Sequence, residues 1–163
     1  MKFKEAVTYD DMLLVPQYSD ITSRSEVDIS NALNVTSALQ LPIMASPMDT
    51  VSEVDMAVAM AKAGGLAVIH RYNSIVEQGR LVSLAAAAIS NITVDPMVAA
   101  AIGVTGDYLE RATTVVALGA NVLCVDVAHG HHIMMKNALQ ELRKAFGDDI
   151  YIIAGYVCTQ ESV

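Results

Sequence analysis

The sequence predicts an α/β protein built around a parallel sheet, and three features of its 163 residues lead to this fold class. Five short segments are apolar at consecutive rather than alternating positions, which indicates strands that are covered on both faces. Helical patterns fill the gaps between these segments, so that strands and helices alternate along the chain. Capping residues and glycines mark the borders of the helices. The expected strands are 41–46, 66–70, 98–104, 122–127 and 150–157.

The first two predicted helices each begin at a serine. Ser52 stands three residues before Asp55, which is the spacing of a capping box, and this helix is expected to end at the glycines 64–65. Ser74 precedes a glutamate at the same spacing and opens a segment that runs to about residue 88.

Two further helices follow the third and fourth strands. Residues 105–107 lead into a helix that is expected to stop at Gly119. The last helix is expected to run from about residue 133 to residue 146 and to stop at Gly147. Residues 1–40 form a polar, turn-rich lead-in, and the order of the remaining elements is β-α-β-α-β-α-β-α-β.

This alternation is compatible with a doubly wound open sheet and with a (β/α)8 barrel. An open sheet would be complete at 163 residues, whereas a barrel needs at least about 200, so the chain would then hold only the first five strands. We find no linker, low-complexity tract or internal repeat, and residues 1–163 are therefore expected to form one domain.

Composition excludes several classes of protein. Apolar residues make up 53% of the chain and charged residues 17%, which is not the composition of a disordered chain. No apolar run reaches the ~18 residues of a membrane span, and the amino terminus does not resemble a signal peptide, so we expect a cytoplasmic protein without a membrane partner. Two cysteines without an export signal favour a reducing compartment. A formal charge of −8 disfavours binding to nucleic acid.

Polar residues and glycines gather at the carboxyl ends of the expected strands. Ligands bind at these ends in both candidate architectures, so the pattern predicts a ligand site there. The segments concerned are 46–50, 70–73, 103–107, 126–132 and 155–159.

Three of these polar residues are candidates for a direct role. Asp126 ends an otherwise apolar strand, so its carboxylate is expected to be partly desolvated. It can bind a ribose or hold a catalytic group, and it can equally cap the following loop. His70 and Arg71 can bind an anionic or aromatic ligand, or can simply face solvent at a strand end.

The histidines and cysteines give weaker signals. His129, His131 and His132 crowd one loop, but no Glu or Cys stands at a recognised ligand spacing, so we expect no metal there. Cys124 lies in the middle of a strand and is expected to be a small buried hydrophobe. Cys158 lies at an open strand end without an activating partner nearby in the sequence.

Seven motifs, taken together, resemble the inosine monophosphate dehydrogenase and guanosine monophosphate reductase family. They occur in order along nearly the whole chain, and no single one would suffice. The motifs are Thr8–Pro16, Ser23–Asp28, Ser46–Val51, Gly64–Leu66 with Ile69–Arg71, Gly103–Gly106, Asp126–His131 and Ala154–Gly155. The resemblance implies the (β/α)8 TIM barrel rather than the open sheet.

The resemblance also implies a chemistry. The family binds a purine nucleotide monophosphate and NAD or NADP across the top of the barrel. A loop cysteine attacks purine C2, and a hydride passes between that carbon and the nicotinamide. Ser46 and Met48 match positions that contact the nucleotide, and Gly155 is expected on the same side. Asp126 and Arg71 match positions with catalytic roles. The expected cofactor side comprises His70, Arg71, Asp126 and His129.

Three departures from the family pattern matter. The family's catalytic cysteine loop follows the fifth strand, and neither cysteine here matches its motif, so this chain alone is expected to be an inactive fragment. Tyr156 stands where Gly-Asn-Val is usual, which alters one contact on the nucleotide side. Only the short connection 80–97 occupies the place where many dehydrogenases insert a regulatory tandem domain, so that domain is expected to be absent.

The motifs favour a dehydrogenase that converts IMP to XMP with NAD. A reductase that converts GMP to IMP with NADPH is an alternative, because many reductases lack the regulatory domain, although Arg71 replaces their lysine. A truncated half-barrel that binds a partner through its open edges is a further alternative, as is an open sheet that binds another nucleotide. The resemblance implies a homotetramer when the barrel is complete, and activation by a monovalent cation that depends on the cysteine loop.

Overall fold

A computed structural model describes residues 7–33 and 37–163 of the chain, and a five-stranded parallel sheet forms its body. The strands are β3 (Met44–Ala45), β4 (Leu66–Ile69), β5 (Ala99–Ile102), β6 (Val122–Val125) and β7 (Tyr151–Ala154). Each strand pairs with its neighbours in the sequence, in the order β3-β4-β5-β6-β7. A doubly wound sheet reverses its strand order, whereas a barrel does not. The fold is therefore a partial TIM barrel, as predicted.

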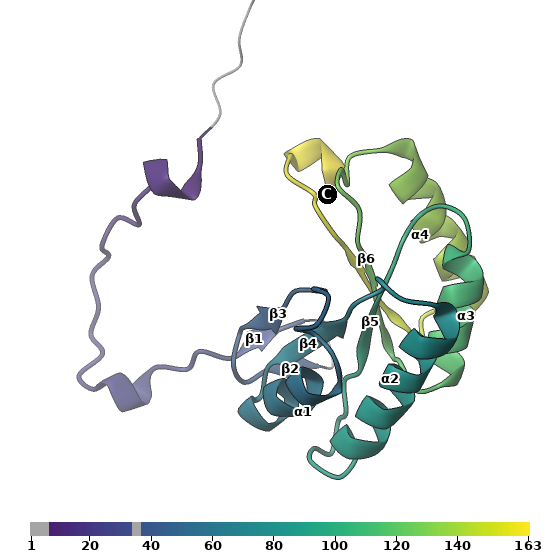
Figure 1. Cartoon of the computed structure of the whole chain (residues 1–163). Helices are drawn as coiled ribbons and strands as arrows, with labels where there is room; N and C mark the ends of the chain where they lie inside the picture. The colour runs from purple at the N-terminus through teal and green to yellow at the C-terminus, as the bar shows by residue number, and fades with distance from the viewer. Residues whose placement is uncertain (1–6, 34–36) are drawn as a thin grey trace, which may run out of the picture.

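Helices follow β3, β4, β5 and β6, and α2, α3 and α4 line one side of the strands in Figure 1. The four are α1 (Val54–Ala63), α2 (Ile75–Ile89), α3 (Tyr108–Ala117) and α4 (Ile133–Phe146). Within residues 7–33 and 37–163, no helix is long and apolar enough to cross a membrane.

The central strands β4, β5 and β6 are buried at every position, and so on both faces, since alternate residues of a strand point to opposite sides. Ile69, Ile102 and Val125 belong to the larger cluster, which also contains the apolar residues of the helices. Val68 and Cys124 belong to a second cluster on the opposite, inner face. This double burial explains why the strands are continuously apolar in the sequence.

Ser74 caps α2 as the sequence predicts, whereas the predicted cap of α1 at Ser52 is wrong. The Ser74 hydroxyl accepts a hydrogen bond from the Glu77 N–H at 3.1 Å. Ser52 does not cap α1, because its hydroxyl is buried and donates to the Ser46 carbonyl. Glu53 takes the N-cap position without a side-chain hydrogen bond. Ser52 thus ties the loop after β3 together instead of starting the helix.

The lead-in contains an antiparallel pair that the sequence did not predict, β1 (Asn31–Ala32) and β2 (Ala38–Leu39). Leu39 is buried in the inner cluster of the sheet. Leu33 shares a hollow with Val122 and Tyr151, the first residues of β6 and β7, so the pair lies at the amino-terminal end of the strands.

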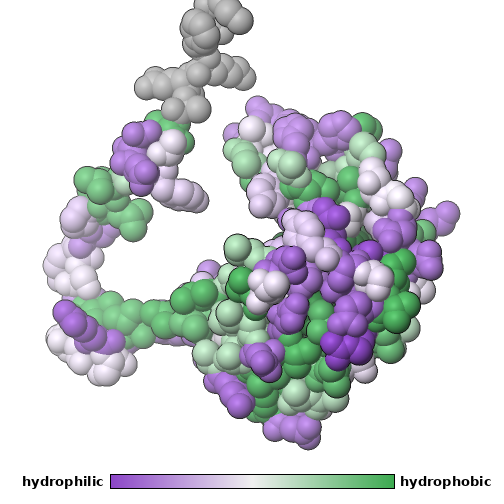
Figure 2. All heavy atoms as spheres, viewed as in Figure 1, coloured by the Kyte–Doolittle hydropathy of each residue, from purple (hydrophilic) through white to green (hydrophobic). Residues whose placement is uncertain are grey.

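Residues 7–30 form an arm that extends away from the sheet (Figure 1). It contains two short 3-10 turns, η1 (Tyr9–Asp11) and η2 (Arg24–Glu26). Apolar side chains of the arm such as Leu13 and Leu14 are almost fully exposed, and Figure 2 shows hydrophobic surface along it.

Candidate functional site

A hollow of about 650 Å³ opens at the carboxyl ends of β3, β4, β6 and β7. Loop residues after β3 form one wall, and residues from the ends of β6 and β7 face them across the hollow. Four of the residues predicted from the sequence to contact a ligand line this one hollow: Ser46, Met48, Asp126 and Gly155. The strand ends therefore bring together residues that lie up to 109 positions apart.

A smaller hollow of about 330 Å³ adjoins the first and shares three residues with it, Tyr72, Asp126 and Tyr156. Arg71 lines only the smaller hollow. The two hollows thus adjoin along these shared residues, so ligands bound in them would be neighbours.

Arg71, which lines the smaller hollow, forms a loose pair with Asp126, which lines both. Arg71 Nη2 donates to the Asp126 backbone carbonyl at 3.0 Å. The side-chain atoms Arg71 Nε and Asp126 Oδ2 are 3.7 Å apart, which is an ion pair but too long for a hydrogen bond. Arg71 Nε is buried and has no hydrogen-bond partner among the described residues. The Asp126 side chain is 13% exposed, so its predicted partial desolvation is confirmed.

This loose geometry leaves hydrogen-bonding capacity for a ligand. A carboxylate has about four acceptor sites and a guanidinium has five N–H donors, and the direct pair uses few of them. The Arg71 side chain is 33% exposed, so a ligand can reach its guanidinium although the orphaned Nε itself is buried. Arg71 also lies over the ring of Tyr72, 5.9 Å from its centroid, which helps to hold the guanidinium in place.

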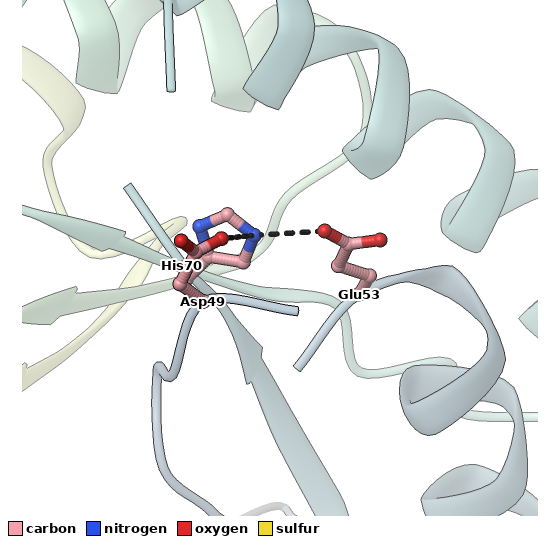
Figure 3. A group of neighbouring side chains, drawn as sticks. All are labelled: Asp49, Glu53 and His70. Atoms are coloured by element: carbon pink, nitrogen blue, oxygen red, sulfur yellow. Dashed lines mark hydrogen bonds and ion pairs between the residues drawn. The ribbon is translucent and has the colours of Figure 1, made fainter. Parts of the chain in front are cut away.

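His70 lies deeper than the other polar residues, with only 2% of its surface exposed. The Tyr72 N–H donates to His70 Nδ1 at 3.2 Å, so this nitrogen carries the lone pair and Nε2 carries the proton. Nε2 donates to Glu53 at 3.1 Å and lies 3.7 Å from Asp49 (Figure 3). These contacts pin the loop between β3 and α1 to the end of β4.

Asp49, Glu53 and His70 also place one potential metal-ligand atom each within 4.8 Å of one another. A metal would need the lone pair of His70 Nε2, but that nitrogen is protonated in this hydrogen-bond arrangement. The cluster is therefore better explained as a histidine that anchors two carboxylates. The role of His70 as a direct cofactor contact stays a prediction, and its burial favours an indirect role.

The three histidines of the β6–α4 loop are exposed and lie near one another, with ring centroids 6.4 and 6.5 Å from that of His129. His132 caps α4 by accepting from the Met134 N–H at 3.1 Å. His131 lies 3.2 Å from the Thr159 hydroxyl. None of the three lines either hollow, so the role of His129 toward a cofactor also stays a prediction.

Two residues adopt a left-handed backbone that their side chains disfavour, and both lie beside the larger hollow. Thr50 has a φ of 60° and Tyr156 a φ of 55°. Thr50 follows a residue that lines the hollow, and Tyr156 lines it directly. Such strain persists only where the surrounding structure enforces it, and it gathers at functional sites. The sequence marked Tyr156 only as a departure from the family's Gly-Asn-Val pattern, and nothing in it marked Thr50.

Close packing of two glycines explains how this edge is held. A Cβ on Gly130 would lie 2.6 Å from the Tyr156 carbonyl oxygen, and one on Gly155 would lie 2.8 Å from the Val125 carbonyl oxygen. The Gly130 N–H donates to the Tyr156 carbonyl and the Gly155 N–H to the Val125 carbonyl, each at 3.0 Å. Only glycine permits these approaches between β6 and the segment after β7.

Cys124 is buried and Cys158 is exposed, as their positions in the sequence predicted. Cys124 is buried, and desolvation, with the Asp126 carboxylate as a second cause, raises the pKa of its thiol to about 11. Its thiol is therefore protonated near neutral pH and is a poor nucleophile. Cys158 is exposed, and its thiol contacts the Tyr156 carbonyl at 3.7 Å.

A buried polar group beneath the site was missed by sequence reasoning. Gln78 is fully buried and donates to the carbonyls of Ala101, at 2.8 Å, and Ile69, at 3.4 Å. Arg111 donates to the Gln78 side chain at 3.0 Å and to the Asn73 carbonyl at 3.2 Å. These bonds join α2 and α3 to the ends of β4 and β5, and so they support the site from behind.

A sequentially ordered parallel sheet with charged residues and glycine loops at its carboxyl edge defines the class of barrel scaffolds that bind ligands at this edge. Comparison with known sequences narrows this class. Residues 6–163 match the family described as the IMP dehydrogenase / GMP reductase domain, and the chain belongs to this family.

Curated relatives carry both names of the family. An inosine-5'-monophosphate dehydrogenase of Nitrosopumilus maritimus is 27% identical over 279 aligned positions, covering 99% of this chain and 58% of the relative. One of Cryptosporidium parvum is 31% identical over 97% of this chain and 48% of the relative. A GMP reductase of Leishmania donovani is 46% identical over 56% of this chain and 19% of the relative. The chain spans about half the length of the relatives that it matches most fully.

Proposed function

We propose that this chain is the amino-terminal part of a purine nucleotide oxidoreductase, and specifically of an IMP dehydrogenase that oxidises IMP to XMP with NAD. The observation that carries this proposal is the Arg71–Asp126 pair, in which Asp126 lines both hollows and Arg71 lines the smaller one. An oxidoreductase of this kind must hold a nucleotide and a nicotinamide cofactor in contact. We assign one ligand to each hollow, with Asp126 between them.

The larger hollow is proposed to hold the nucleotide. Its volume of about 650 Å³ lies within the usual range for small-molecule sites. Ser46 offers a hydroxyl and Met48 an adaptable apolar surface, and both line the wall after β3. Gly155 leaves room for close approach of the ligand to the backbone at the opposite wall.

Asp126 and Arg71 are proposed as the catalytic residues of this part of the molecule. The Asp126 carboxylate accepts a hydrogen bond from a ligand hydroxyl and orients it, and its low exposure strengthens that interaction. The Arg71 guanidinium donates to a ligand oxygen or nitrogen and stabilises negative charge that develops there. The nicotinamide cofactor, when bound, supplies the hydride acceptor, and Arg71 with Asp126 would form its side of the site.

No residue of this chain is proposed as the attacking nucleophile. Cys124 is protonated and lies within a strand, and Cys158 has no basic partner among the contacts of the described residues. We propose that the nucleophile belongs to the half of the relatives' length that this chain does not span. The 163 residues alone are therefore expected to be inactive.

A GMP reductase is the second candidate, because a relative with that name is 46% identical over 56% of this chain. The connection between α2 and β5 fits either candidate. It comprises only residues 90–98 and leaves no space in the chain for an inserted regulatory domain. The alignment with the Nitrosopumilus dehydrogenase runs over 279 positions, so that relative carries residues with no counterpart here.

The non-catalytic alternative draws on other features of the chain. β3 and β7 are the outer strands of the sheet, and the arm exposes apolar side chains. A half-barrel that binds a partner through these surfaces would lack nucleotide turnover in any combination of substrates. A homotetramer, a cytoplasmic location, activation by a monovalent cation and the absence of nucleic-acid binding stay predictions of the family resemblance.

Steady-state assays of the complete natural polypeptide test the proposal. We expect turnover of IMP with NAD, and a fall in kcat of at least about a hundredfold in Asp126→Asn and Arg71→Met. Asp148→Asn and Arg80→Met are matched controls on exposed side chains outside both hollows, and they should retain parental rates. Turnover of GMP with NADPH alone would identify the second candidate. Parental rates in Asp126→Asn would overturn the assignment of the site.

A further inference from the structure

Tyr156 combines a disfavoured backbone with an exposed aromatic ring. Its φ of 55° lies in the left-handed region, which bulky side chains rarely adopt. Two hydrogen bonds enforce this conformation from either side. The Gly130 N–H donates to the Tyr156 carbonyl, and the preceding Gly155 N–H donates to the Val125 carbonyl, each at 3.0 Å. The chain therefore holds a tyrosine at a position where asparagine or glycine would fit with less strain.

Packing in the core does not compensate for this strain, because Tyr156 is 61% exposed. The residue instead lines both the larger and the smaller hollow. Tyr72, the other aromatic residue that lines both, is already engaged, since Arg71 lies over its ring and the His70 ring stacks at 6.2 Å between centroids. Tyr72 and Tyr156 are equally exposed, at 61%, but among the described residues only the Tyr72 ring is contacted by neighbouring side chains. The Tyr156 ring is therefore the one whose faces are open to a ligand.

We propose that Tyr156 is a specificity-determining residue whose ring stacks on the purine base of a mononucleotide in the larger hollow. This inference rests on the proposed function and adds to it the residue that recognises the base. An aromatic side chain attracts a planar heterocycle through its π-face. The purine is favoured over the nicotinamide because Tyr156 directly follows Gly155, which lines only the larger hollow.

Three variants of the complete natural polypeptide separate stacking from a merely structural role. Tyr156→Asn removes the ring and relieves the backbone, because asparagine tolerates the left-handed region. Tyr156→Phe keeps both the ring and the strain. Tyr18→Asn is a matched control on the exposed arm. The measurements are the thermal unfolding midpoint without ligand, and calorimetric titrations with IMP, with ribose 5-phosphate, which lacks the base, and with NAD.

We expect Tyr156→Asn to raise the unfolding midpoint by roughly 2 to 4 °C and to weaken IMP binding about tenfold. Ribose 5-phosphate binding should not change in this variant. Tyr156→Phe and Tyr18→Asn should bind IMP within about twofold of the parent. A structural role would instead lower the midpoint and weaken both sugar-phosphate ligands together.

Several outcomes would overturn the inference. Unchanged IMP affinity in Tyr156→Asn would show that the ring does not contact the base, while the proposed function would stand. A loss of NAD affinity with unchanged IMP affinity would assign the ring to the cofactor instead. A parent protein that does not bind IMP would overturn the proposed function together with this inference. This outcome is distinguishable from the others, because they concern the Tyr156 variants and not the parent.

Discussion

Replacing Gln78 with leucine is expected to destabilise the fold by about 3 kcal/mol, although the two side chains have similar volumes. Gln78 is fully buried and makes three hydrogen bonds, to the carbonyls of Ala101 and Ile69 and from Arg111. The two neutral bonds contribute about 0.5–1.5 kcal/mol each, and the one from the guanidinium about 1.5–3 kcal/mol. The added apolar side chain offsets about 1–2 kcal/mol of this loss.

The energetic coupling between Gln78 and Arg111 gives a more specific test than the single substitution. Arg111→Met also removes the bond to Gln78, so the double variant should be less destabilised than the sum of the single variants by roughly 1–2 kcal/mol. Urea unfolding followed by circular dichroism at pH 7 measures each free energy of unfolding. Arg80→Met is the control, because its pair with Glu77 is exposed and should contribute under about 1 kcal/mol.

Two results would refute the reasoning about this buried group. A loss below about 1 kcal/mol in Gln78→Leu would show that its hydrogen bonds do not stabilise the fold. Strict additivity of the two substitutions would show that Gln78 and Arg111 act independently.

Three further predictions concern other parts of the site. Burial, followed by the Asp126 carboxylate, raises the pKa of the Cys124 thiol from 9.0 to about 11. The stability that comes from keeping this thiol protonated should be complete below pH 9 and fall by roughly 3 kcal/mol as pH rises through 11. Urea unfolding at several pH values should show this dependence in the parent and not in Cys124→Ala. Gly130→Ala should destabilise by roughly 1–3 kcal/mol because its Cβ would lie 2.6 Å from the Tyr156 carbonyl oxygen, and an unchanged urea midpoint would contradict this packing. Zn²⁺ should leave the thermal midpoint unchanged because His70 Nε2 is protonated, and an increase that disappears in His70→Asn would reverse that interpretation.

The sequence alone was sufficient for the order and type of the main elements. A strand buried on both faces must be apolar at every position, so β4 (Leu66–Ile69) and β6 (Val122–Val125) are visible without any knowledge of their neighbours. Ser74 caps a helix through a residue three positions away, which is also local information. The partial desolvation of Asp126 followed from its place directly after an apolar strand.

Tertiary structure decided the features that depend on distant partners. The β1–β2 pair contains only two residues in each strand, and the burial of Leu39 depends on the inner face of the sheet. Ser52 has the spacing of a cap, yet its hydroxyl donates to the Ser46 carbonyl instead. Gln78 and Arg111 are 33 residues apart and meet only after α2 and α3 pack together.

The same division applies to the site. Local sequence determined that polar residues stand at the strand ends, because an apolar strand must give way to a polar loop when it reaches the edge of the core. Only the folded chain determined that His70 is anchored by Glu53 and that Tyr156 is held at a positive φ. Burial and backbone strain are properties of a residue's three-dimensional neighbours, which for Tyr156 include Gly130, a residue 26 positions away in the chain.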